Sequence, residues 1–317
     1  SEPRAVASCS IIRRPRAACI NRIDEVYGIQ KPCSRVSQQF PHRPTGKLVV
    51  ALTDEDRVRL EELKAEGDKS GVPGLEIVDA AAIRRLEPLA RGRWALYSPR
   101  TGIISPYEFT IALAECAWRN GAEVRLETPV EAVAFRDGLF ILSTPKGELS
   151  ARRVVNGAGL FADEVARLAG IDEFRVVPYR GEYLITDRDC GLRLTMPVYP
   201  VPPRDDPGLG IHITPTLEGN ILLGPSAEPV AGKRDAASTR NVTARLKTEA
   251  GRLMPELARV SFIHSYAGIR PKVVDRTGKD KFGDFVVEES RLRPGWINLV
   301  GIESPGLTAA PAIAVMV

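Results

Sequence analysis

Val154–Asp163 has the sequence VVNGAGLFAD, in which an apolar strand passes through a GxGxxA turn into a helix. This order is typical of a nucleotide-binding turn, because glycines let the backbone approach a ligand and a helix N-terminus attracts phosphate. The alternative is a tight turn whose glycines only allow the helix to pack closely on the strand. The stretch therefore predicts a strand-turn-helix unit of an α/β protein, with a ligand site as one possible use.

The segments around this turn extend the pattern. Strands and helices alternate before it, and a hairpin is predicted where Arg136-Asp137-Gly138 separates two strand-like runs. After residue 174 short strands dominate. We expect two domains, one α/β on a parallel sheet and one on a mixed or antiparallel sheet. Strands are predicted at 47–52, 75–78, 94–97, 124–126, 130–135, 139–144, 152–155, 182–186, 210–215, 221–223, 262–266, 284–288 and 296–300, and helices at 53–66, 80–87, 107–119 and 239–253.

The composition is that of an ordinary globular protein. The 317 residues are 44% hydrophobic and 26% charged, with a net charge of +4 and both signs interspersed, so the overall charge favours neither nucleic acid nor a membrane surface as a partner. No stretch approaches the roughly 18 apolar residues of a membrane-spanning helix. Five cysteines without a CxxC pair predict neither a disulfide framework nor a zinc site. We expect a cytoplasmic protein, with attachment to a membrane surface left open.

Two further segments are candidates for chemistry. In Gly301–Ala310, GIESPGLTAA, a strand ends in a turn with two glycines and enters a helix, which offers backbone N–H groups to an electron-rich ligand. A tight turn between packed elements is the equal alternative. In Tyr266–Lys272, YAGIRPK, Arg270 could grip a carboxylate or phosphate with two hydrogen bonds and Lys272 could add a charge. A surface arginine near a turn is the commoner outcome.

The three segments occur in the order and approximate spacing of the FAD-dependent D-amino-acid-oxidase superfamily, and the chain resembles that family over about residues 45–317. It is most similar to the branch of L-2-hydroxyglutarate oxidases and FAD-dependent glycerol-3-phosphate dehydrogenases. The supporting segments are TGKLVVAL at Thr45–Leu52, GIISP at Gly102–Pro106, GEYL at Gly181–Leu184, GIHITPTLEGNILLGP at Gly210–Pro225 and GIESPGLTAAP at Gly301–Pro311.

The resemblance implies a Rossmann-like FAD-binding domain and a substrate domain. It assigns residues 101–173 and 291–317 to the first, and 46–100 and 174–290 to the second. Flavin-ring contacts are implied for the turn that begins at Gly301, and backbone or central contacts with FAD for two earlier segments. The implied cofactor residues are Val130, Gly157, Ala158, Gly159, Gly301, Ser304, Pro305, Gly306, Leu307 and Thr308.

The implied reaction is hydride transfer from a small 2-hydroxy acid or a polyol phosphate to the flavin. Arg270, Tyr183 and Lys272 would hold the anionic substrate. His212 and His264 are weak candidates for the base, because a histidine in a strand is more often a structural one. Quinone, oxygen and a partner subunit stay open as electron acceptors.

Residues 1–45 depart from the family pattern. They lack the GxGxxG turn that would bind the FAD pyrophosphate, and their irregular Arg, Pro, Ser and Cys predict a leader of a truncated chain. A flavin-free remnant with a binding or structural role is therefore the alternative function. An NAD-dependent dehydrogenase built on Gly157–Ala162 is a third reading, but no acidic residue ends a strand about 20 residues later, as the ribose would require.

Overall fold

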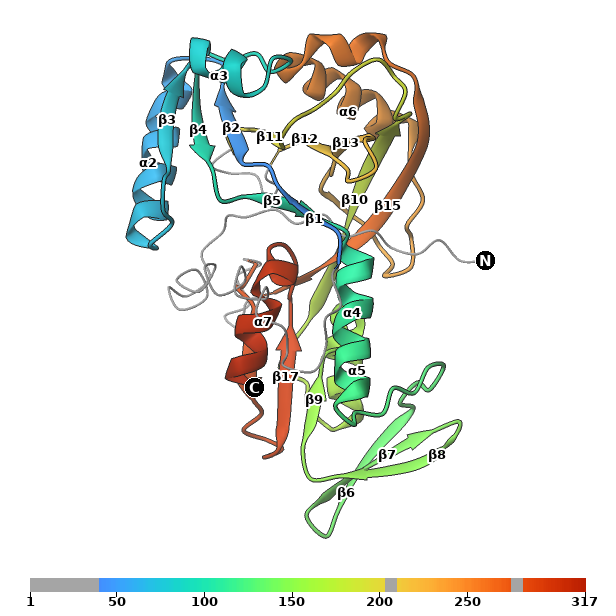
Figure 1. Ribbon diagram of the computed structural model, residues 1–317. Coiled ribbons are helices and arrows are strands. Elements are labelled where there is room, and N and C mark those ends of the chain that lie inside the picture. Colours follow the sequence, from blue (N-terminus) through green and yellow to red (C-terminus); the bar gives the residue numbers. More distant parts are fainter. Residues whose placement is uncertain (1–39, 203–209, 275–281) are drawn as a thin grey trace.

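The computed structural model describes residues 40–202, 210–274 and 282–317 (Figure 1). The predicted leader lies outside these ranges as far as residue 39. The upper half of Figure 1 contains a large sheet and the lower half contains smaller ones. Two long antiparallel strands, β10 (Val176–Thr186) and β15 (Phe262–Val273), run from one half to the other.

Nine strands of the described residues form the large sheet in the order β14-β10-β13-β12-β11-β2-β4-β3, with β15 on β10. Besides β10 and β15, the sheet contains β2 (Lys47–Ala51), β3 (Glu76–Asp79), β4 (Trp94–Ser98), β11 (Val198–Pro200), β12 (His212–Pro215), β13 (Ile221–Gly224) and β14 (Glu228–Pro229). The helices beside it are α2 (Glu55–Lys69), α3 (Ala80–Leu86), α6 (Arg240–Leu253) and the short η3 (Pro255–Arg259).

The strand β2 shows why its residues Leu48–Ala51 are apolar without a break. Leu48 and Val50 belong to the core that α6 covers, whereas Val49 and Ala51 belong to the core that includes Leu60 of α2. Successive strand residues point to opposite faces, so a strand covered on both faces needs apolar residues at every position.

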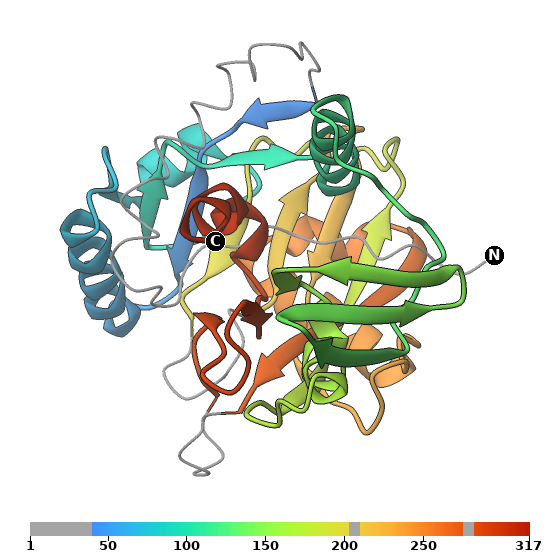
Figure 2. The same ribbon diagram turned by 90° about the horizontal axis from the view of Figure 1, so that it is seen from below.

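The lower half holds a three-stranded sheet in the order β16-β17-β9, with β17 parallel to β9. Seen from below, a second sheet of three antiparallel strands lies nearest the viewer (Figure 2). The strands β1 (His42–Pro44) and β5 (Gly102–Ile104) form a separate two-stranded sheet just beneath the large one (Figure 1). The other elements are α4 (Pro106–Arg119), β6 (Ala132–Arg136), β7 (Leu139–Thr144), β8 (Gly147–Ala151), β9 (Val154–Asn156), η2 (Gly159–Phe161), α5 (Ala162–Leu168), β16 (Val286–Glu289), β17 (Trp296–Val300) and α7 (Gly306–Met316).

Several local predictions are confirmed. The predicted hairpin is β6–β7, and Asp137 and Gly138 at its turn have φ of 52° and 77°, the left-handed values that a two-residue hairpin turn requires. The carboxylate of Asp79 caps α3 by accepting from the Ala82 amide at 2.8 Å. The mixed α/β fold class is also confirmed, and the domain boundaries stay a proposal.

Other predictions are wrong or incomplete. Residues 124–126 are not a strand: Val124 and Leu126 are 51% and 74% exposed, and no strand among the described residues pairs with them. α2 continues through Gly67 to Lys69, because this glycine leaves room for the Leu75 side chain rather than ending the helix. The strand β8 was not predicted.

Candidate active site

The strands β10 and β15 together present one face of polar and aromatic side chains. Their register pairs residues of equal orientation, and side chains alternate between the two faces of a sheet. The pairs on this face are Tyr183 with Tyr266, Gly181 with Gly268, and Tyr179 with Arg270.

The two tyrosines form a stacked wall. The ring centroids of Tyr183 and Tyr266 are 5.1 Å apart with an interplanar angle of 10°. Burial, and then the neighbouring Tyr183 hydroxyl, raise the pKa of Tyr266 well above its usual value. The Tyr266 hydroxyl therefore stays protonated and can donate a hydrogen bond but is a poor base.

Arg270 lies over the backbone of the partner strand. A Cβ at Gly181 would stand 3.5 Å from Nε of Arg270 and 3.0 Å from Cβ of Pro225. A side chain at position 181 would press on Pro225, and glycine avoids this contact while the guanidinium lies above it. The Arg270 side chain is 20% exposed, so it is largely desolvated yet accessible to a small anion.

Lys272 lies further along the same strand face and is engaged by a carboxylate. Its Nζ is 2.8 Å from Oε1 of Glu303, and its side chain is 4% exposed. The other oxygen of Glu303 is 4.0 Å from Nη1 of Arg270. Glu303 belongs to the turn between β17 and α7, so this ion pair connects the turn to β15.

His212 is buried in β12. Its ring stacks on Tyr199 with centroids 4.0 Å apart. Nδ1 lies 3.2 Å from the Gly210 carbonyl oxygen, which can only accept, so we assign the proton of the neutral ring to Nδ1 and the basic lone pair to Nε2. Burial, followed by the charge of Arg270, lowers the pKa of His212 to about 3. The charge of Arg270 therefore acts on the His212 ring.

This lowered pKa makes folding depend on pH. Between pH 6.5 and about 3 the unfolded chain binds a proton at His212 that the folded chain does not, so stability falls as the pH drops through this window. The loss is at most about 1.4 kcal/mol per pH unit. We expect His212→Gln to flatten the pH dependence of the unfolding free energy, as measured by urea titrations at pH 7, 5.5 and 4.5. Equal slopes for both proteins would contradict the assignment.

His264 lies far from Arg270 along β15. It lies on the same strand face as Tyr266 and Arg270 but is exposed. Arg270 is six positions further along the strand, which corresponds to roughly 20 Å. Of the two predicted histidines, His212 is the one that the structure brings into the electrostatic environment of Arg270.

The two predicted glycine turns lie at the same edge of the sheet β16-β17-β9. β9 and β17 are parallel, with Asn156 in register with Asn298, so the turns at Gly157 and Gly301 follow neighbouring carboxyl ends. A Cβ at Gly301 would stand 2.6 Å from Cγ1 of Val273, at the end of β15. The turn therefore packs against the strand that carries Arg270.

The residues present fit a bound flavin nucleotide on the side they cover. Gly157, Gly159 and Gly268 would each direct a Cβ into open space, so a ligand can approach their backbones. Nδ2 of Asn298 is buried and has no hydrogen-bond partner among the described residues. The turn Ser304, Pro305, Gly306, Leu307 and Thr308 leads into the N-terminus of α7, where partial positive charge favours electron-rich groups.

Val130 and Ala158 complete the predicted cofactor residues. Val130 is half-buried and lies two residues before β6, outside the strand that was predicted to contain it. Ala158 precedes η2, and its amide donates to Oδ1 of Asn156 at 3.3 Å.

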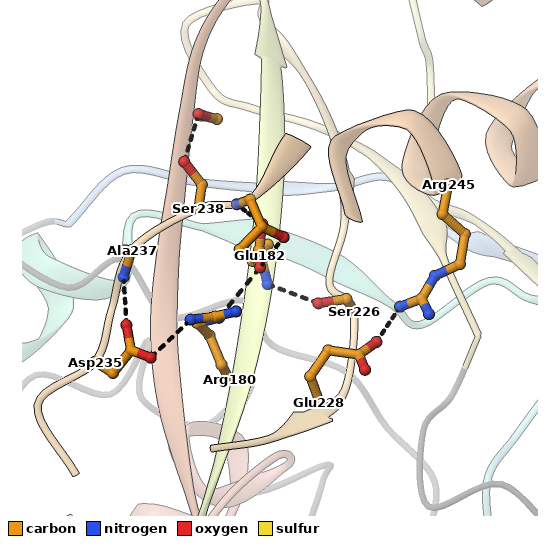
Figure 3. Close-up of polar contacts among 10 residues, drawn as sticks. Arg180, Glu182, Ser226, Glu228, Asp235, Ala237, Ser238 and Arg245 are labelled. Atoms are coloured by element: carbon orange, nitrogen blue, oxygen red, sulfur yellow. Dashed lines mark hydrogen bonds and ion pairs between the residues drawn. The ribbon is translucent and has the colours of Figure 1, made fainter. Parts of the chain in front are cut away.

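A network of charged residues supports the opposite face of β10 (Figure 3). The Glu182 carboxylate is buried, lies 3.1 Å from Nε of Arg180 and accepts from the Thr239 amide at 2.6 Å. The Glu182 amide donates to Oγ of Ser226, and Arg180 also pairs with Asp235 at 3.0 Å. These contacts hold the strand of Tyr183 against the segment that enters α6.

The sequence profile of the family described as FAD dependent oxidoreductase (DAO) matches residues 22–317. The chain belongs to this family. The match begins 23 residues before residue 45, where the resemblance in the sequence became visible. It thus includes part of the segment that was predicted to be a leader.

The chain is similar to two kinds of curated relatives. It is 34% identical over 281 residues to a glycerol 3-phosphate dehydrogenase of Caloramator mitchellensis, covering 88% of this chain and 57% of that protein. It is 29% identical over 323 residues to a mitochondrial L-2-hydroxyglutarate dehydrogenase of Caenorhabditis elegans, covering 88% and 74%. The chain thus spans little more than half the length of the first relative.

Solved structures have the same fold. An FAD-bound L-alpha-glycerophosphate oxidase from Mycoplasma pneumoniae superposes with a TM-score of 0.83 at 25% identity, over 95% of this chain and 79% of the other. An L-proline dehydrogenase from P. horikoshii superposes with a TM-score of 0.82 at 20% identity, over 97% and 80%. The second likeness concerns the fold alone.

Within this DAO-family fold, sequence reasoning missed Glu303, Glu182 and Lys47. Lys47 is buried and its charge contributes to the lowered pKa of His212. A carboxylate inside the strand segment GEYL and another inside the turn GIESPG were visible as charged residues in apolar surroundings. Their partners are distant in sequence, so the sequence indicated no role for them.

The described ranges contain neither a candidate membrane-spanning helix nor a candidate metal-binding group. None of their helices combines the length and hydropathy that crossing a membrane requires. The same ranges contain no group of three or more His, Cys, Asp or Glu side chains arranged to hold a metal ion.

Proposed function

We propose that this protein is an FAD-dependent oxidoreductase that oxidises a small anionic substrate with a C–H next to a hydroxyl, either glycerol 3-phosphate or a 2-hydroxy acid such as L-2-hydroxyglutarate. The main support is the position of Arg270, a largely buried guanidinium over the backbone of Gly181, on the strand face that also carries the stacked Tyr183 and Tyr266. The relatives' names and the family's cofactor agree with this chemistry.

The substrate residues have distinct roles in this proposal. Arg270 binds the carboxylate or phosphate group with two parallel, charge-assisted hydrogen bonds. The stacked rings of Tyr183 and Tyr266 exclude water from one side of the substrate. Lys272 acts on this site through its ion pair with Glu303, next to Arg270. Nε2 of His212 accepts the hydroxyl proton as the ketone forms, because a bound anion next to the ring raises its proton affinity.

FAD supplies the acceptor for the hydride that leaves the substrate carbon. The residues that would hold it are the backbones at Gly157, Ala158 and Gly159, the segment before β6 at Val130, and the turn from Gly301 through Ser304–Thr308. The proposal leaves three acceptors for reoxidation of the reduced flavin: quinone, oxygen or a partner subunit. It also includes a cytoplasmic location.

The test is the visible spectrum of the purified chain after incubation with FAD and removal of free flavin. Retained flavin bands that bleach anaerobically with glycerol 3-phosphate or L-2-hydroxyglutarate, and not with glycine or L-proline, are the expected result. A colourless chain that unfolds cooperatively would overturn the proposal and favour a flavin-free binding or structural role instead.

A further inference from the structure

The ion pair between Lys272 and Glu303 lies next to Arg270. We propose that Glu303 is a positioning residue: it neutralises Lys272 and is held by it, so that Arg270 alone faces the substrate's anionic group. This inference rests on the proposed function, because it assumes that Arg270 binds an anion.

Lys272 is placed to hold Glu303 rather than to contact a substrate. Its ammonium lies 2.8 Å from the carboxylate and within 5.1 Å and 5.7 Å of the ring centroids of Phe282 and Tyr179. With its side chain 4% exposed, it is enclosed on several sides. A direct substrate contact would require Lys272 to leave Glu303 and expose an unpaired buried carboxylate, which is costly.

Glu303 stands between two cations at unequal distances. It is within hydrogen-bond distance of Lys272, whereas its second oxygen is 4.0 Å from Nη1 of Arg270, too far for a hydrogen bond. Without Lys272, Arg270 is the remaining cation paired with this carboxylate in the described ranges. A glutamate that pairs with Arg270 occupies the place of a substrate carboxylate and competes with it.

Glu303 also links the turn before α7 to β15. Glu303 directly precedes Ser304, and its carbonyl oxygen accepts from the amide of Gly306 at the start of α7. One residue therefore connects the β17–α7 turn to the strand of Arg270. Charge at the anion site and the position of the turn are coupled through it.

The test measures binding of glutarate, a dianion without a hydroxyl, to the full chain by titration calorimetry at low salt. We expect Lys272→Met to weaken binding by roughly tenfold or more, and Glu303→Gln to strengthen it several-fold, as for gain or loss of one charge at short range. The double variant should return to within about threefold of the parent, because Arg270 is then free of both neighbours.

The outcomes separate this inference from the proposed function. If Arg270→Met leaves glutarate binding unchanged, or the parent binds no glutarate, the proposed anion site is wrong and the inference falls with it. If Arg270→Met abolishes binding but the double variant stays as weak as Lys272→Met, then Lys272 contacts the anion directly and Glu303 is not a positioning residue. Weaker binding in Glu303→Gln would indicate a merely structural pair and also overturn the inference.

A matched control and a folding check complete the design. Lys64 and Asp68 form a 2.6 Å pair on the exposed side of α2, so Lys64→Met and Asp68→Asn repeat the same charge changes at a remote place. They should leave glutarate binding unchanged. If Lys272→Met does not fold, by circular dichroism, Glu303→Gln alone decides, since tighter binding is the result that a structural role does not produce.

Discussion

Replacing Arg270 by methionine should lower kcat/KM for the true substrate by about 10²–10³-fold, which corresponds to roughly 3–4 kcal/mol. The loss is large because the guanidinium is largely buried, and its removal leaves the substrate's anionic group desolvated without a partner. Steady-state kinetics with glycerol 3-phosphate and with L-2-hydroxyglutarate measure the effect.

Two companion variants make the Arg270 result specific. Arg270→Lys keeps the charge but loses the planar fork, so an intermediate loss is expected. Arg188 is exposed and pairs only loosely with Asp189, and Arg188→Met should change kcat/KM by less than about twofold. In Arg270→Met the pKa of His212 should also rise, because a positive neighbour is gone; NMR titration of the ring can follow this without any cofactor. Activity within threefold of the parent would contradict the role of Arg270.

Gly301→Ala should lower the free energy of unfolding by about 2–5 kcal/mol, the second large effect. Two costs add. Gly301 has φ of +72°, which a residue with a Cβ adopts with strain, and the new Cβ would stand 2.6 Å from Cγ1 and 2.8 Å from Cβ of Val273. Urea denaturation measures the loss, and reduced retention of FAD should accompany it because the turn packs against β15.

The chain contains a matched control for the Gly301 variant. Gly138 has φ of +77° but open space around it, so Gly138→Ala carries the backbone cost alone, about 1 kcal/mol or slightly more. Adding Val273→Ala to Gly301→Ala should recover the part due to the steric clash. If Gly301→Ala costs no more than Gly138→Ala, the packing of the turn on β15 does not matter for stability.

Local elements followed from local chemistry. The hairpin turn at Asp137 and Gly138, the cap at Asp79 and the strand Trp296–Val300 were all predictable, because propensity, turn residues and capping act over a few neighbouring positions. The failure at residues 124–126 has a physical reason. A strand needs a partner for its backbone groups, and none lies beside it in the described part of the chain.

The candidate site was predictable only in pieces. The motif turns at Gly157 and Gly301 were found from glycine spacing, and Arg270 from its chemistry in YAGIRPK, although the strand predicted to end at residue 266 continues through Arg270 to Val273. Nothing in the sequence distinguished the buried His212 from the exposed His264, since both lie in strand-like segments. Nor did it show that Lys272 is engaged by Glu303, because an ion pair across 31 positions depends on how β15 meets the β17–α7 turn.

The amino-acid pattern was enough to establish the α/β class, most strands and helices, and the resemblance to a flavoenzyme family. The three-dimensional packing was needed to bring together Tyr183, His212 and Arg270, and to add Glu303 to them. The reason is that helices, caps and turns are encoded within a few residues. The pairing of β10 with β15 instead depends on burying one particular face of each strand, and a shift of one residue would turn Arg270 away from the site.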